Sequence, residues 1–162
     1  MHLQPRLETL VSKSLVGQRL TMSFAHNRTQ ELWQRFMKHR AAIPNVRGNE
    51  LYSLEIFGDP RFFERFDPNY AFEKWAAVEV QDLNNVPDEL EGLTLPSGMY
   101  AVFNYRGKSS EAGPTYQYIF TEWLPASGLL LDNRPHFALM GNKYKNDDPD
   151  SEEELWVPVR RR

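Results

Sequence analysis

The chain has 162 residues, of which 41% are hydrophobic and 13% aromatic, and its formal net charge is −3. This composition is sufficient for a packed core, so we expect a folded chain rather than a disordered one. The net charge gives no indication of a broad basic face for nucleic acid, and we expect the three arginines at residues 160–162 to form a solvated tail.

The sequence contains no cysteine, which excludes disulfide bonds and cysteine-based zinc sites. The four histidines lack the spacing of a metal-binding pair, so we predict no metal and no cofactor. The first 17 residues are too polar for a secretory signal, and no apolar run reaches the roughly 18 residues of a membrane span. The sequence therefore predicts a cytoplasmic protein.

The predicted elements form two series with the same order. The first series is a strand over residues 9–26 broken at Gly17, a helix over 27–44, a strand over 49–57, a loop over 58–70 and a strand over 72–80. A polar connector covers about residues 83–92. The second series is a strand over 93–107, a short helix over 115–128, a strand over 134–144, an acidic turn over 145–153 and a strand over 154–161.

Three short patterns recur in the same order in the two series: a pair of apolar doublets in the helix, an apolar position in the next strand, and E-x-W-x-x-V in the last strand. The matched positions are Leu32 with Ile119, Leu54 with Phe137, and Glu73 with Glu154. The offsets of 87, 83 and 81 residues are nearly equal, which indicates a duplicated unit.

The duplication predicts an α+β fold of two βαββ repeats with pseudo-twofold symmetry, in which helices cover one face of antiparallel sheets. A single domain is expected over residues 1–162, with repeat 1 at about 5–82 and repeat 2 at about 93–162. Because this domain fills the chain, we expect no DNA-binding domain and no direct contact with DNA.

Side chains of a strand alternate between its two faces, so each apolar row is expected to pack under a helix. The rows assigned to the helix side are Tyr52, Leu54 and Ile56; Ala76, Val78 and Val80; Phe137 and Leu139; and Leu155, Val157 and Val159. The opposite face is then expected to carry Glu55, Phe57, Glu73, Trp75, His136, Ala138, Met140, Glu154 and Trp156.

An apolar face with two tryptophans does not remain open to water, so the repeats should close around it as a cleft or a second subunit should cover it. A cleft with aromatic walls and a few carboxylates suits an organic cation. The alternative is that both tryptophans are ordinary core residues and the glutamates are solvated.

The segments GLTLPSGMYAVFNYRG, EWLP and RPHFALMGNKYKNDDPDSEEELWVPVRR resemble the GyrI-like family, which includes effector-binding domains of AraC-type and MerR-type regulators. The first half, with ELWQRFM and FEKWAAVEV, resembles the bacterial members that consist of this domain alone. The resemblance covers nearly the whole chain. It implies two βαββ repeats with a ligand cleft between them, and binding of small, often hydrophobic and cationic molecules.

The resemblance also implies a role for Tyr116, which lies in a region where related domains place a tyrosine over the ligand. The sequence departs from the family at Ala138, where a glutamate commonly faces the ligand. Glu55 is the repeat-related position, so we expect Glu55, with Glu73 or Glu154, to supply the negative charge; a preference for neutral ligands is the alternative.

The preferred interpretation is an effector-binding domain, a monomer or weak dimer, that holds a small organic molecule and contacts no membrane. One alternative is a hydrolase of reactive small molecules, since some family members resemble hydrolases; the sequence shows no nucleophile motif. The other is an inhibitor or interaction protein that uses the acidic residues 147–154.

Overall fold

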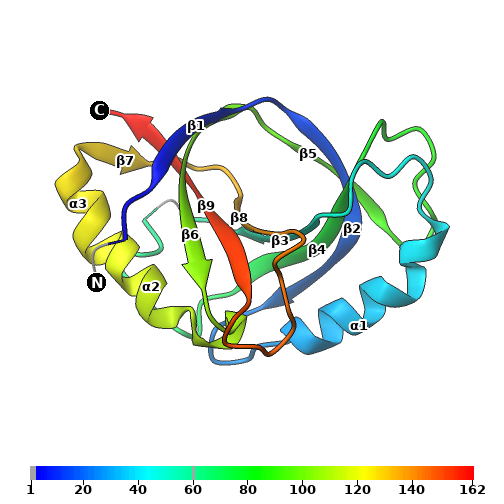
Figure 1. The fold of residues 1–162 in the computed structure, drawn as a ribbon, viewed down its shortest axis with the longest axis horizontal. Helices are drawn as coiled ribbons and strands as arrows, with labels where there is room; N and C mark the ends of the chain where they lie inside the picture. The colour runs from blue at the N-terminus through cyan, green and yellow to red at the C-terminus, as the bar shows by residue number, and fades with distance from the viewer. Residues whose placement is uncertain (1–2, 60) are drawn as a thin grey trace.

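The computed structural model describes residues 3–59 and 61–162. It has an α+β fold built on one antiparallel sheet with the strand order β1-β6-β9-β8-β3-β4-β2-β5, and β7 pairs with β9 (Figure 1). The predicted fold class is thereby confirmed.

The strands are β1 (Arg6–Leu10), β2 (Lys13–Met22), β3 (Leu51–Ile56), β4 (Phe72–Val80), β5 (Glu91–Leu95), β6 (Gly98–Arg106), β7 (Leu129–Leu131), β8 (His136–Met140) and β9 (Glu152–Arg161). The helices are α1 (Thr29–His39), α2 (Gly113–Tyr118) and α3 (Leu124–Ser127), with a π-helical turn η3 (Ile119–Trp123) between the last two. Short 3-10 turns are η1 (Arg40–Ala42) and η2 (Ser109–Glu111).

The two halves meet where β3 pairs with β8. Leu54 lies opposite Trp75 in the first half, and Phe137 lies opposite Trp156 in the second. Leu54 and Phe137 also lie opposite one another across the β3–β8 pair, so the pseudo-twofold axis passes beside them. The series β2-α1-β3-β4 therefore corresponds to β6-α2/α3-β8-β9.

The first strand of each half pairs with the other half. β1 precedes β2 in the chain but pairs with β6, whereas β5 precedes β6 but pairs with β2. The segment before β5 is not a free linker, because Leu83, Val86 and Leu90 pack against the core beneath α1. These contacts join the halves into one folded body.

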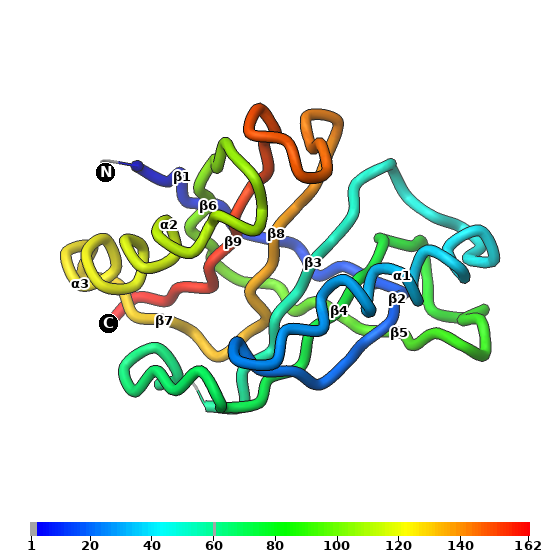
Figure 2. Tube along the Cα trace, turned by 90° about the horizontal axis from the view of Figure 1, so that it is seen from below, coloured from blue at the N-terminus to red at the C-terminus, as the bar shows by residue number. Residues whose placement is uncertain are grey.

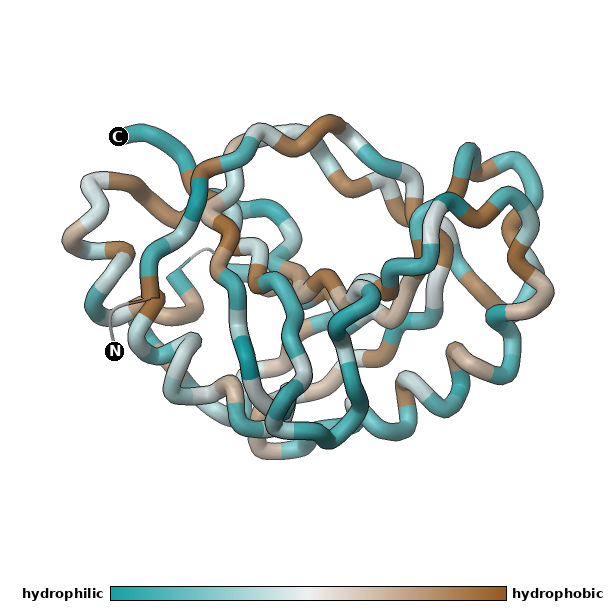
Figure 3. The backbone as a smooth tube through the Cα atoms, in the orientation of Figure 1, coloured by the Kyte–Doolittle hydropathy of each residue, from teal (hydrophilic) through white to brown (hydrophobic). Residues whose placement is uncertain are grey.

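The apolar side chains form three clusters, two of them beneath the helices. Leu32 and Phe36 of α1 are fully buried against β2 and β4, and Ile119 is fully buried against β6 and β9. The third cluster lies on the opposite face, where the outer strands contribute Leu10 and Leu95. The sheet therefore curls around this face, as Figure 1 shows. The turn over residues 141–151, which connects β8 and β9, is hydrophilic (Figure 3).

Some predicted boundaries were wrong. β2 continues through Gly17, and the break in the first strand falls at residues 11–12. Gly17 is required for another reason: a Cβ there would lie 2.1 Å from the carbonyl oxygen of Ala76 on the neighbouring strand. The strand predicted over 93–107 is two strands, β5 and β6, and the short strand β7 was not predicted.

Within residues 3–59 and 61–162, no helix combines the length and the apolar character that crossing a membrane would require.

Candidate functional site

The structure divides the predicted site residues between the two faces of the sheet. Those on the face opposite the helices, as predicted, are Glu73, Trp75, Glu154 and Trp156. Those on the helix face, contrary to prediction, are Glu55, Phe57, His136, Ala138 and Met140. The error arose because the apolar rows of β3 and β8 do pack inward, but into the cluster enclosed by the curled sheet rather than beneath the helices.

Both tryptophans lie in a packed core. Trp75 is 3% exposed and Trp156 is 7% exposed, and the Trp156 ring stacks on Phe137 with centroids 5.1 Å apart. The core around them includes side chains of both halves, so packed side chains enclose each indole.

The repeated E-x-W motif forms the same hydrogen bond twice. The indole nitrogen of Trp75 donates to Glu73, at 2.6 Å, and that of Trp156 donates to Glu154, at 3.1 Å. Each glutamate also pairs with an arginine, Arg19 at 3.0 Å and Arg6 at 2.7 Å. The motif recurs because a buried indole N–H needs an acceptor, and the residue two positions earlier lies on the same face.

A different group of polar side chains gathers on the helix face, between α1 and α2. Both helices begin near the middle of the sheet and run away from it, so neither helix covers the central strands between them (Figures 1 and 2). We call this region the inter-helix site. Its polar members are Glu55, Lys74, Tyr116 and Glu153, and its ring-bearing members are Phe63, Phe120 and His136.

The pairing of the strands fixes the positions of these polar groups. Glu55 of β3 lies opposite Lys74 of β4 on one side and opposite His136 of β8 on the other. Glu153 of β9 lies opposite Tyr105 of β6 and accepts a hydrogen bond from Ser109, at 3.0 Å. Residues more than 80 positions apart in the sequence are thereby brought to one place on the sheet.

The carboxyl groups of this site are poorly hydrated. Burial raises the pKa of Glu55, and the positive charge of Lys74 lowers it in part. Burial also raises the pKa of Glu153, an effect that the hydrogen bond from Ser109 and the charge of Lys74 reduce. Tyr116 has a pKa well above its ordinary value because of burial, with the charges of Glu55 and Glu153 adding to the effect. Three groups with raised pKa values therefore surround one ammonium.

A ladder of aromatic rings borders the carboxyl groups. Phe120 is parallel to Tyr116, with centroids 6.3 Å apart, and stacks on Phe63 at 3.9 Å. His136 contacts both phenylalanines, at 5.8 Å from Phe120 and 5.7 Å from Phe63. The negative faces of such rings attract a cation once the rings separate.

The π-helical turn η3 has a cause in the sequence. Pro125 has no N–H to donate to the carbonyl of Thr121 one turn earlier, so the regular hydrogen-bond ladder cannot continue there. The helix widens to a π turn over Ile119–Trp123, which contains Phe120 of the ladder. The EWLP segment thus shapes the helix that carries Tyr116 and Phe120.

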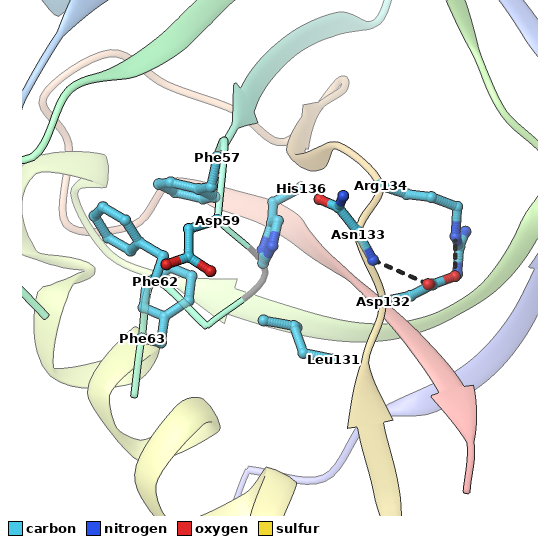
Figure 4. A pocket seen from close by; sticks show the side chains of 9 residues that line it. All are labelled: Phe57, Asp59, Phe62, Phe63, Leu131, Asp132, Asn133, Arg134 and His136. Atoms are coloured by element: carbon cyan, nitrogen blue, oxygen red, sulfur yellow. Dashed lines mark hydrogen bonds and ion pairs between the residues drawn. The ribbon is translucent and has the colours of Figure 1, made fainter. Parts of the chain in front are cut away.

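A small notch adjoins the ladder, with a volume of about 10 Å³. Figure 4 shows His136 between Phe57 and Asp59 on one side and Asn133 on the other. Burial lowers the pKa of His136 to about 3, and the nearby Arg134 contributes to this, so the imidazole is neutral. The notch has room for about one water molecule, and a drug-sized molecule does not fit it.

Lys74 and Glu153 were missed as site residues, although the sequence contains their signal. Each extends an apolar row that was assigned correctly: Lys74 precedes Ala76, Val78 and Val80, and Glu153 precedes the row that begins at Leu155. The neighbouring Glu154 was chosen because it belongs to the repeated motif. The acidic turn, proposed as a contact surface, pairs within the chain, since Asp147 meets Lys108 and Asp150 meets Arg106.

A family model described as a GyrI-like small molecule binding domain matches residues 3–160. The chain belongs to the GyrI-like family. The resemblance inferred from the sequence is therefore confirmed, and this GyrI-like chain is a small-molecule-binding domain.

A relative with a sequence match is the transcriptional regulator BrlR of Pseudomonas aeruginosa, 26% identical over 147 residues, which are 90% of this chain and 52% of BrlR. The chain thus spans about half the length of that regulator. The structure of SAV2435 bound to tetraphenylphosphonium is similar with a TM-score of 0.69 and 20% identity, over 99% of this chain and 94% of that one. The C-terminal domain of EcmrR is similar with a TM-score of 0.74 and 15% identity over the full length of both chains. These structural likenesses show that the fold is shared.

Proposed function

We propose that this GyrI-like domain is an effector-binding domain that holds a hydrophobic organic cation in the inter-helix site. The observation that carries the proposal is the meeting of two poorly hydrated carboxyl groups, Glu55 and Glu153, with the aromatic ladder of Tyr116, Phe120 and Phe63. The tetraphenylphosphonium bound by SAV2435 is a ligand of this chemical class.

The physical argument starts from the cost of burying a charged carboxylate without a partner. A carboxylate that has lost water regains electrostatic stabilisation when an organic cation binds beside it. Such a cation is itself weakly hydrated, and aromatic rings attract it through their negative faces. We therefore assign to Tyr116 and Glu55 the ligand-binding roles expected from the sequence, whereas Trp75 and Trp156 are proposed to stabilise the fold.

Binding requires the site to open. The notch of about 10 Å³ is far smaller than a drug-sized molecule, and the closely stacked rings of Phe63 and Phe120 occupy the adjoining space. We expect the ligand to separate these rings and to take the place of one of them. Pockets for small molecules commonly have volumes of about 300–1,000 Å³, so the change is substantial.

The test is the binding of ethidium, a fluorescent monocation, to the wild type and to Glu55→Gln. The substitution removes one charge and preserves the shape, and the affinity should fall roughly tenfold, as expected for a charge–charge interaction in a partly buried site. The matched control is Glu154→Gln, which removes one charge on the other face and leaves a side chain that can still accept the Trp156 hydrogen bond. Equal affinities of Glu55→Gln and the wild type would contradict the proposal.

A hydrolase is the second candidate, supported by the raised pKa of Glu153 beside Tyr116. A carboxyl group that stays protonated closer to neutral pH is suited to general acid catalysis. Mass spectrometry of bound ligands after incubation distinguishes the candidates, because an effector-binding domain returns its ligand unchanged.

A further inference from the structure

Lys74 places a positively charged side chain inside the inter-helix site, which is proposed to bind organic cations. It stands opposite Glu55 in the sheet, on the helix face, and it is half-buried. Its ammonium nitrogen donates to the hydroxyl of Thr29 at the start of α1, at 3.2 Å. Its charge acts on both Glu55 and Glu153.

The geometry does not tie the ammonium to a single carboxylate. Among the ion pairs within 4.0 Å that connect residues 3–59 and 61–162, none joins Lys74 to Glu55 or to Glu153. The hydrogen bond that is formed by the ammonium is the one to the Thr29 hydroxyl. A positive group of a ligand can therefore approach these carboxylates without displacing a direct ion pair with Lys74.

We propose that Lys74 determines the charge of the ligand, because the ionised forms of Glu55 and Glu153 together with the Lys74 ammonium have a combined charge of −1 and select a monovalent organic cation over a divalent one. This inference rests on the proposed function and names the ligand class of the same site. A monovalent cation neutralises the three groups together. Among these three groups no further carboxylate is left to neutralise a second positive charge on the ligand, and Lys74 repels that charge.

The test compares ethidium with propidium, which carry the same phenanthridinium ring system, one positive charge in ethidium and two in propidium. The wild type should bind ethidium more tightly. Lys74→Met keeps most of the aliphatic length of the side chain and removes the charge. Because the repulsion scales with ligand charge, the ratio of the two affinities should move in favour of propidium by roughly threefold to tenfold.

Two variants control for effects on net charge and on structure. Lys13→Met removes an ammonium that pairs with Glu79, at 3.3 Å, on the other face of the sheet, and should leave the ratio unchanged. Lys74→Arg keeps the charge and should retain the wild-type preference. Circular dichroism checks folding, and Lys74→Gln replaces the methionine variant if the latter does not fold.

The outcomes separate the inference from the proposed function. If the wild type binds ethidium but Lys74→Met leaves the ratio unchanged, or if Lys13→Met shifts it equally, the inference is wrong and the proposed function stands. If neither dye binds the wild type or Lys74→Met, the proposed function is overturned and the inference with it.

Discussion

The rings of Phe63 and Phe120 stack face to face, with centroids 3.9 Å apart and planes inclined by 11°. Phe63 belongs to the loop before β4 in the first half, and Phe120 belongs to the helix of the second half. This stack joins the halves on the helix face and occupies the ring surface that a ligand would use. The ligand must compete with Phe63 for Phe120.

The first prediction concerns this competition. Phe63→Ala frees one face of Phe120, so the association rate constant for ethidium should increase, because less of the closed site has to open before the dye enters. Stopped-flow fluorescence measures this rate. The control is Phe66→Ala, in the same loop, which removes an exposed ring that contacts Phe24 and Phe62. An unchanged or lower rate for Phe63→Ala would show that the stack does not limit entry.

The second prediction concerns the stability cost of Glu55. Because its pKa is raised in the folded protein, its contribution to stability is full below the unfolded pKa and is lost as the pH rises through the folded pKa. Glu55→Gln removes this loss and should be more stable than the wild type at pH 7.5, with a difference that shrinks towards pH 4. Urea denaturation at both pH values measures this.

The same ionisation should govern ligand binding with the opposite sign. Cation affinity should fall as the pH is lowered through the raised pKa values of Glu55 and Glu153, because their protonated forms carry no charge. Glu55→Gln would then gain stability and lose affinity together. A variant that loses both would indicate a structural role for this carboxylate.

The third prediction concerns His136. Its pKa falls to about 3 in the folded protein, so its contribution to stability is full above about pH 6.5, the ordinary value for the unfolded chain, and decreases as the pH falls towards 3. The slope from this one group is at most about 1.4 kcal/mol per pH unit. His136→Phe preserves a ring against Phe57 and removes the titration, so its unfolding free energy should decline less between pH 6.5 and 4.

Denaturation at several pH values measures the slope, and His26→Phe, which changes an exposed imidazole, controls for the loss of a histidine. A wild-type slope in His136→Phe would show that other groups cause the acid sensitivity.

The sequence was sufficient to predict the fold class because the duplication repeats the same local apolar patterns in both halves. The helix doublets at Leu32 and Ile119 do bury their first residues, and the rows through Val78 and Val157 do lie beneath the helices. In each case the apolar residues of the row recur at every second position, and the helix of the same half presents apolar residues that cover them.

The site could be predicted only in part because β3 and β8 are buried on both faces. Leu54 packs into the enclosed cluster, and Phe57, three residues later, packs beneath α1. Alternation indicates which residues share a face, but it does not indicate which face meets which layer. That assignment depends on the exchange of β1 and β5 between the halves, which curls the sheet and fills the side that the sequence suggested would stay open.

The last prediction separates the two locations for the ligand. Trp75→Phe retains an aromatic ring in the enclosed cluster and removes the N–H that donates to Glu73 at 2.6 Å. Glu73 keeps its ion pair with Arg19, so the expected cost is that of one hydrogen bond, about 1 kcal/mol of unfolding free energy. Ethidium affinity should be unchanged, because the indole lies on the face opposite the inter-helix site. Trp156→Phe, which removes the corresponding bond to Glu154, should behave in the same way. Denaturation and fluorescence titration of the same samples measure both quantities.

A loss of affinity without a loss of stability in either variant would indicate that the ligand binds on the face that carries the tryptophans. An indole that only stabilises the fold cannot change the affinity while the unfolding free energy stays the same.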